Sequence, residues 1–168
     1  MHDRVLVAGV GNIFLGDDGF GVEVVRRLAS ETLPDGVLVA DFGIRGIHLA
    51  YELLDQDYDA MILVDATPRG EEPGTVYCIE PNFGALESTE PSSSDAHTMN
   101  PEAVFALLKS LGGTPQRVII VGCEPARIAE EIGLSEPVAR AVENAVQVIL
   151  NLVRRENGTP RAASGFSR

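Results

Sequence analysis

The chain has 168 residues, of which 45% are hydrophobic and only 5% aromatic, so it suits one compact domain with an aliphatic core. Its 25 acidic residues outnumber 13 Lys and Arg, giving a net charge of −12. This charge would repel nucleic-acid phosphates and anionic lipid surfaces, which argues against nucleic-acid and membrane partners.

The first predicted element is a short strand at residues 4–10, followed by a glycine-rich turn. Its run of apolar residues has no polar interruption, which is typical of a strand buried on both faces of a parallel sheet. A helix is expected from Gly19 to about Thr32, because apolar side chains recur there at helical spacing. Asp17 and Asp18 lie between the two elements, where open α/β sheets keep their sites.

The next two predicted strands each end at an aspartate. Residues 37–40 precede Asp41, and residues 60–64 precede Asp65. A helix at 47–54 is expected between them. Since the carboxyl ends of parallel strands meet at one edge of a sheet, these acids should lie at the same edge as Asp18.

Two more strands complete the predicted sheet. The strand at 75–80 follows too short a connection for a helical crossover, so it should be antiparallel or lie at an edge. The last strand is expected at 117–122, with helices at 100–111 and 135–156 before and after it. This alternation predicts a three-layer, doubly wound α/β fold whose five-stranded sheet is mostly parallel, with one antiparallel strand.

Residues 81–99 lack apolar periodicity and are predicted to form a long loop that contains His97. Loops of this length in compact domains are usually functional or mobile. Residues 1–156 should form a single domain, and residues 157–168, in which Gly, Pro, Ser and Arg dominate, should form a disordered tail.

The cysteines and the amino terminus indicate a reducing, cytoplasmic location. Cys78 and Cys123 lie in apolar, strand-like runs without a neighbouring Cys or His at metal-ligand spacing, so both are expected to be buried thiols. The chain begins Met1-His2-Asp3-Arg4 and passes directly from these residues into a strand, without the pattern of a signal peptide. No apolar run reaches the length needed to span a membrane.

Two familiar kinds of site match the sequence poorly. Gly9-Val10-Gly11 follows a strand as in a Rossmann-like nucleotide-binding domain, but Phe14 stands where a third glycine is needed. The adjacent carboxylates would also repel a pyrophosphate, so this interpretation is only a minor alternative. A serine or cysteine nucleophile is disfavoured because there is no GxSxG turn and neither cysteine has a nearby histidine.

The acids at the strand ends favour a metal site instead. Asp18, Asp65 and, with less support, Asp41 should end neighbouring strands, and the loop of His97 could fold over them. Two carboxylates and one imidazole would neutralise a divalent cation and leave positions open for water or substrate. Taken singly, Asp18 could cap a helix, Asp65 could cap a turn and His97 could be a surface residue. Their convergence favours the metal site, because neighbouring carboxylates raise the pKa of one of them unless a cation is present.

The run from Gly9 to Gly21 resembles the opening motif of the hydrogenase maturation endopeptidases. The resemblance covers about residues 4–153, and its other segments are Asp41–Gly46, Ile62–Ala66, the His97 loop, Gly122–Pro125 and Ile132–Ser135. It implies a cytosolic protease that removes the C-terminal extension from the large-subunit precursor of a nickel-iron hydrogenase once nickel is in place. A nickel or assembly-checkpoint module that binds the precursor without cleaving it is the alternative.

The resemblance also implies roles for individual residues. Asp18, Asp65 and His97 match the positions that contact the metal and would carry out the cleavage. The nickel would be presented by the precursor, although another divalent metal could occupy the site. Phe42 and Ile44 depart from the Asp-Gly-Gly-Thr segment that is common in the family. The residues expected to shape the site or bind substrate are Asn12, Asp17, Asp41 and Gly43.

Overall fold

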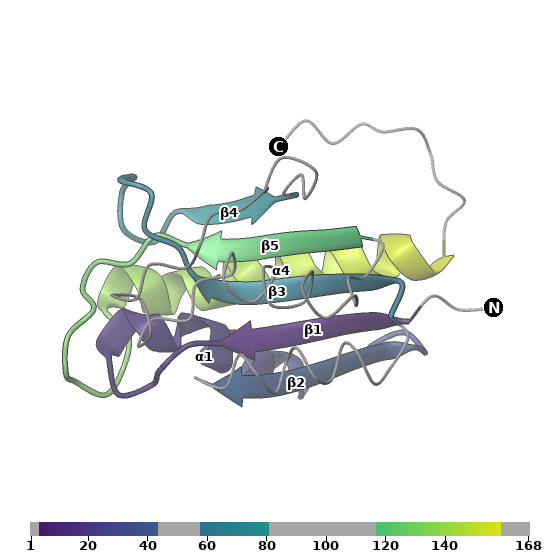
Figure 1. Cartoon of the computed structure of the whole chain (residues 1–168), viewed down its shortest axis with the longest axis horizontal. Helices are drawn as coiled ribbons and strands as arrows, with labels where there is room; N and C mark the ends of the chain where they lie inside the picture. Colours follow the sequence, from purple (N-terminus) through teal and green to yellow (C-terminus); the bar gives the residue numbers. More distant parts are fainter. Residues whose placement is uncertain (1–3, 44–57, 81–116, 159–168) are drawn as a thin grey trace, which may run out of the picture.

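The computed structural model of the protein describes residues 4–43, 58–80 and 117–158 (Figure 1). The helices predicted at 47–54 and 100–111 lie outside the described residues, as do the loop with His97 and the tail after residue 158. Among the described helices, none has the length and apolar composition needed to cross a membrane.

The described residues form a five-stranded sheet with the order β2-β1-β3-β5-β4. The first four strands in this order are parallel, and β4 pairs with β5 in the antiparallel direction at the edge. The mostly parallel sheet and its one antiparallel strand were both predicted, and they are confirmed. The strands are β1 (Val5–Val10), β2 (Val37–Gly43), β3 (Ala60–Ala66), β4 (Val76–Ile79) and β5 (Arg117–Cys123).

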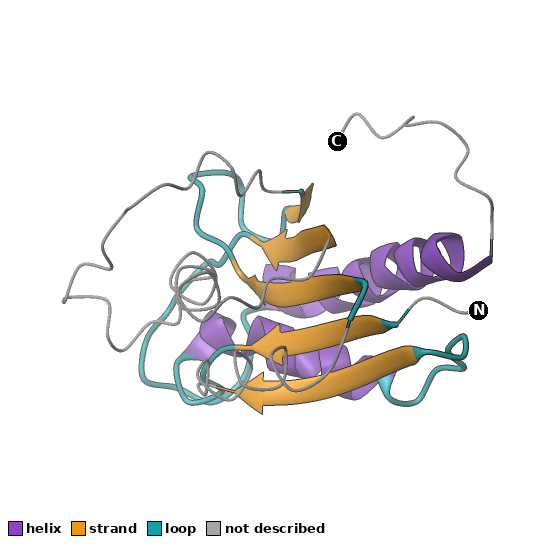
Figure 2. Cartoon of the chain, turned by 45° about the vertical axis from the view of Figure 1, so that its right-hand side comes forward, coloured by secondary structure: helices purple, strands orange, loops and turns teal. Residues whose placement is uncertain are grey.

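Both faces of the sheet bury apolar side chains. Every residue of the central strands β1 and β3 is buried, as their apolar runs predict, and in β3 the buried residues include Asp65. The helices α1 (Phe20–Leu28) and α4 (Glu136–Gly158) pack side by side on one face (Figures 1 and 2). Their apolar stripes cover one set of strand side chains, while alternate strand residues form a second buried cluster on the opposite face: Leu6, Ala8, Val10, Met61, Leu63 and Val118.

Glycine allows the first turn of α1 to approach the sheet closely. A Cβ atom on Gly21 would lie 2.1 Å from the carbonyl oxygen of Val64 and 2.5 Å from that of Val10. These atoms belong to the backbones of β3 and β1, which cannot move aside as a flexible side chain could. The start of α1 is therefore held against the carboxyl ends of the two central strands.

Replacing Gly21 with alanine should lower the free energy of unfolding by about 3 kcal/mol, because the added methyl group overlaps two backbone carbonyls. Urea denaturation measures the loss. Gly70→Ala is the matched control: Gly70 has a φ of 85° but no heavy atom within 4 Å of the added Cβ. The free energy of unfolding of that variant should fall by only about 1 kcal/mol, because alanine is strained at a positive φ. Equal losses in the two variants would contradict the close-packing explanation.

The two cysteines are free and lie on the neighbouring strands β4 and β5. Cys123 is buried, and burial together with the charges of Asp17 and Glu124 raises its thiol pKa to about 12. Cys78 is only partly buried, so the prediction of two buried thiols is right for Cys123 alone. The pKa of Cys78 is also raised, by burial and then by Glu80, so neither thiol is activated as a nucleophile.

Candidate active site

The turn after β1 folds back so that its backbone contacts Asp18. Gly11 has a φ of 134°, and a Cβ atom on it would lie 1.9 Å from the carbonyl oxygen of Asp18. The amide of Asn12 donates a hydrogen bond of 2.8 Å to Asp18 Oδ2, and the amide of Phe14 donates one of 2.9 Å to Asn12 Oδ1. The side chain of Asn12 therefore braces the turn, as predicted, and its amide holds the carboxylate of Asp18.

Asp65 lies on the other side of this turn, within β3 rather than just after it. It is 4% exposed, and its Oδ1 atom lies 3.7 Å from the position that a Cβ on Gly11 would take. Burial, and then the charge of Asp18, raise the pKa of Asp65 well above its usual value. Burial also raises the pKa of Asp18, partly offset by the hydrogen bond from Asn12. The charge of Asp18 therefore adds to the effect of burial on Asp65, and both carboxyls are harder to ionise than a free aspartate.

Asp18 does not cap the helix α1, the simpler role that its position in the sequence allowed. The residue that precedes α1 is Gly19, and no side chain caps this helix. Asp18 instead belongs to the short 3-10 helix η1 (Gly16–Gly19), which leads from the turn into α1. Its partly buried carboxylate is therefore available for chemistry at the sheet edge.

The Asp18–Asp65 pair has the donor chemistry of a divalent-metal site. Carboxylate oxygens are good ligands for such ions, and a bound cation would offset both the burial and the charge of Asp18 that raise the pKa of Asp65. The described residues contain no group of three potential metal ligands. His97, the third predicted ligand, lies outside the described residues. The pair fits a metal, and completing its coordination would need donors from elsewhere.

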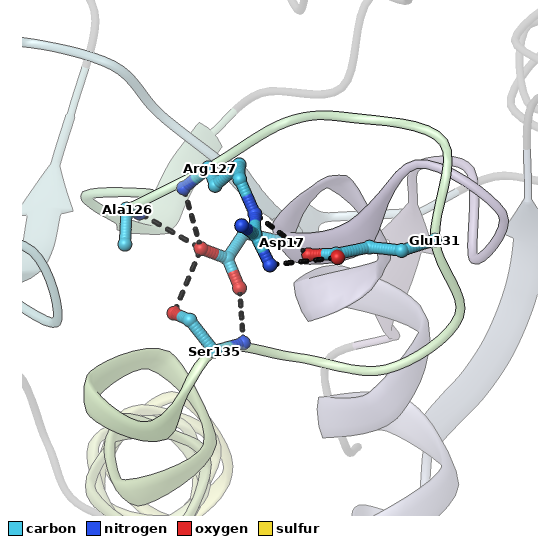
Figure 3. A network of polar contacts seen from close by, with 5 residues as sticks. All are labelled: Asp17, Ala126, Arg127, Glu131 and Ser135. Carbon is cyan, nitrogen blue, oxygen red and sulfur yellow. Dashed lines mark hydrogen bonds and ion pairs between the residues drawn. The ribbon is translucent and has the colours of Figure 1, made fainter.

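Asp17 points away from this pair, although it directly precedes Asp18 in the sequence. Its fully buried carboxylate accepts four hydrogen bonds from the 124–135 loop (Figure 3). Three come from the amides of Ala126, Arg127 and Ser135, and the fourth comes from the hydroxyl of Ser135, the residue before α4. Burial raises the pKa of Asp17, but these hydrogen bonds outweigh it and leave the pKa below its usual value.

This orientation separates Asp17 from Asp18, although the two are adjacent in the sequence and Asp17 was expected to shape the site or bind substrate. Asp17 is 0% exposed, so it does not face a substrate in this structure. It shapes the site indirectly, because it anchors η1 to the 124–135 loop and so holds the helix that carries Asp18.

Asp41 also lies apart from the pair. Its strand, β2, flanks β1 on the side opposite β3, which carries Asp65. The exposed carboxylate of Asp41 accepts a hydrogen bond of 2.8 Å from the amide of Gly43, and it lies 4.0 Å from Nε of Arg26. Gly43 in turn accepts a hydrogen bond from the amide of Gly11, so it supports the turn. The role of Asp41 in substrate binding stays a prediction.

Glu124, for which no role was predicted, is a buried acid at the same edge of the sheet. Its Oε1 atom accepts hydrogen bonds from the Tyr77 hydroxyl at 2.7 Å and from the amides of Arg69 and Glu71 at 2.8 and 3.0 Å. Burial raises the pKa of Glu124, yet these donors lower it below its usual value overall. Glu124 directly follows β5, so the rule that singled out the other strand-end acids would have found it.

Glu124 holds in place the segment that connects β3 to β4. The turn at 69–71 lies just after β3, and the Glu124 carboxylate ties it to β4 through Tyr77. Burial and the hydrogen bond to Glu124 raise the pKa of Tyr77 to about 12, so this hydroxyl stays protonated at neutral pH. Glu124 is a structural acid whose donors lower its pKa, whereas the pKa values of Asp18 and Asp65 stay raised.

Known proteins with similar sequences and folds point to one family. The model of the hydrogenase maturation protease family matches residues 22–152. The chain is 38% identical to a Methanocaldococcus jannaschii protein described provisionally as a hydrogenase maturation protease, over 90% of this chain and 97% of that protein. It is 30% identical to the hydrogenase expression/formation protein HupD of Rhizobium leguminosarum, over 90% of this chain and 74% of HupD.

Two solved structures share the fold along nearly the whole chain. A hydrogenase 2 maturation peptidase from a Thaumarchaeota archaeon superimposes with a TM-score of 0.67 at 35% identity, covering 89% of this chain and 97% of its own. The hydrogenase maturating endopeptidase HybD of Escherichia coli superimposes with a TM-score of 0.74 at 29% identity, covering 96% and 99%. Sequence and fold agree, and the chain belongs to the hydrogenase maturation protease family.

Proposed function

We propose that this protein is an endopeptidase that removes the C-terminal extension of a nickel-iron hydrogenase large-subunit precursor after nickel insertion. Membership of the family supports a protease. The observation that carries the proposal further is the Asp18–Asp65 pair, a half-buried and a buried carboxylate at the sheet edge whose pKa values are raised by burial and, for Asp65, also by the charge of Asp18. An arrangement that costs stability in this way is typical of a functional site.

In this proposal, Asp18, Asp65 and His97 contact the nickel that the precursor presents. The nickel would polarise the scissile carbonyl and lower the pKa of an attacking water, as metals do in hydrolases. Asp18 is oriented by the amide of Asn12, and Asp65 is shielded from solvent by the surrounding edge of the sheet. One of the two carboxylates accepts the proton of the water. A precursor without nickel would leave their repulsion in place and would therefore dock poorly.

Incubation of the protein with purified precursor, with and without nickel, tests the proposal. Intact-mass measurement should detect a shortened large subunit only in the nickel-loaded sample. A stable stoichiometric complex without any shortened product would instead favour the checkpoint module, which binds the immature subunit without cleaving it.

Replacing His97 with alanine should lower the processing rate about 100-fold or more, because one of the three proposed metal contacts is lost. His48→Ala is the control, since His48 lies in the segment predicted as the second helix and has no proposed contact with the metal. Circular dichroism should show that both variants keep the fold. If His97→Ala trims nickel-loaded precursor at the wild-type rate, His97 has no part in the mechanism.

A further inference from the structure

We propose that Phe14, Ile128 and Ile132 form a docking surface for the folded body of the precursor, here named the apolar rim. This inference rests on the proposed function and adds a binding site to it. Phe14 lies on the 12–16 turn, whose first residue, Asn12, binds the carboxylate of Asp18. Ile128 and Ile132 lie on the 124–135 loop, which is hydrogen-bonded to this turn.

The apolar rim gathers most of the large exposed hydrophobic side chains. Phe14 is 61% exposed, Ile132 78% and Ile128 42%, and among the described residues only Leu38, at 46%, joins them in this class. Leu38 lies near the amino end of β2, away from the carboxyl edge of the sheet. Single exposed apolar residues are ordinary on protein surfaces, whereas a group of them beside a site indicates an interface.

The two loops of the apolar rim are joined by backbone contacts. The amide of Glu131 donates a hydrogen bond of 3.1 Å to the carbonyl of Phe14, and the amide of Gly16 donates one of 2.8 Å to the carbonyl of Glu131. Leu15 and Glu131 form a parallel β-bridge between these bonds. The backbones that carry Phe14 and Ile132 are therefore held next to each other.

Buried and charged groups hold these loops in one arrangement. The carboxylate of Asp17 binds both the start and the end of the 124–135 loop, and the guanidinium of Arg127 pairs with Glu131 at 2.9 and 2.7 Å (Figure 3). A Cβ atom on Gly16 would lie 3.0 Å from the carbonyl of Arg127, so the loops also pack closely. The apolar side chains are thus presented on a preorganised scaffold, which lowers the entropy lost on binding.

The position of the apolar rim favours the precursor as its occupant. Asn12 links the two sites directly, since its side chain accepts from the amide of Phe14 while its amide donates to Asp18. A protein seated on the apolar rim would therefore bring its own chain to the Asp18–Asp65 pair. Contacts remote from the scissile bond provide binding energy that a protease can use to position its substrate.

The charge of the chain disfavours other occupants. A net charge of −12 opposes binding to an anionic membrane, and it also opposes the association of two copies of this chain. Exposed aromatic and aliphatic side chains are typical of the centre of a protein–protein interface. A folded protein partner thus fits the apolar rim best.

The test compares the double variant Phe14→Ala/Ile132→Ala with the control Leu38→Ala, which removes an exposed hydrophobic side chain outside the apolar rim. Steady-state processing of nickel-loaded precursor gives kcat and KM. The double variant should raise KM about tenfold or more, as expected for hot-spot residues, with kcat changed far less. Leu38→Ala should match the wild type in both constants, and thermal unfolding should show that all three proteins are folded.

The outcomes separate this inference from the proposed function. If the wild type trims the precursor and the double variant keeps the wild-type KM, the docking surface is refuted while the proposed function stands. If the wild type does not trim nickel-loaded precursor, the proposed function fails first. Light scattering that shows a wild-type dimer and a monomeric double variant would instead assign the apolar rim to self-association and overturn the inference.

Discussion

Replacing Asp65 with asparagine should lower the processing rate about 1,000-fold or more, a loss typical of removing a group that acts directly in catalysis. Asparagine keeps the size of the side chain but can neither accept a proton from water nor neutralise a cation. Single-turnover cleavage of nickel-loaded precursor measures the effect. Activity within tenfold of the wild type would remove Asp65 from both of its proposed roles.

The same substitution should leave stability unchanged or increase it at neutral pH. The folded protein raises the pKa of Asp65 well above 3.8, so ionising this carboxyl costs folding free energy. The stability of the wild type should therefore fall as the pH rises from about 4 through the raised pKa. Asp65→Asn lacks the ionisable group and should not show this fall.

Urea denaturation between pH 4 and pH 8, in the presence of a chelator, measures this difference. The free energy of unfolding of Asp65→Asn should exceed that of the wild type by an amount that grows as the pH rises. Asp18→Asn is the matched control, because the pKa of Asp18 is raised by a smaller amount and the pH-dependent gain should be smaller. A difference that does not change with pH would show that Asp65 titrates alike in the folded and unfolded states.

Replacing Asp17 with alanine should instead destabilise the protein, by about 3 kcal/mol or more. The substitution leaves the amides of Ala126, Arg127 and Ser135 without the buried carboxylate that accepts from them, and each such donor left unpaired in a partly buried contact costs about 1 kcal/mol or more. Asp41→Ala is the control, since it removes an exposed aspartate with a weak ion pair and should cost less than about 1 kcal/mol. Urea denaturation at pH 7 gives the free energy of unfolding of both variants. Similar losses in Asp17→Ala and Asp41→Ala would contradict the anchoring role of Asp17.

Asp17 should also make the protein sensitive to acid. Its pKa is lower in the folded protein than the usual 3.8, so its contribution to stability is complete above that value. The contribution is lost as the pH falls through the lowered pKa. Asp17→Ala should therefore show a smaller loss of stability than the wild type between pH 4 and pH 2. Consecutive aspartates thus have opposite expected effects, since Asp17 stabilises the fold and Asp18 serves the site.

Local features of the sequence predicted the sheet and the position of the site. The uninterrupted apolar run of β1, and a similar run in β3, identify strands buried on both faces, because side chains of a strand alternate between its faces. Parallel strands place their carboxyl ends at one edge, so the meeting of Asp18 and Asp65 follows from the order of elements. The short connection before β4 likewise predicted its antiparallel pairing.

The direction of each carboxylate could not be read from the sequence in the same way. Asp17 and Asp18 are equivalent in composition and spacing, and only the turn of η1 separates their directions. The partners of Asp17 lie 109 to 118 positions later in the chain, so no local pattern identifies them. Asp41 lies near the carboxyl end of its strand just as Asp65 does, but its place on the far side of β1 removes it from the pair.

The sequence by itself thus determined the parallel sheet, the edge at which its acids gather and the family to which the chain belongs. The tertiary structure decided which acids meet, which one anchors a loop and where exposed apolar side chains collect. The physical reason is that strand patterns and turn residues act over a few neighbouring positions. Hydrogen-bond partners and pKa shifts depend on contacts between distant segments, such as that of Asp17 with the loop before α4.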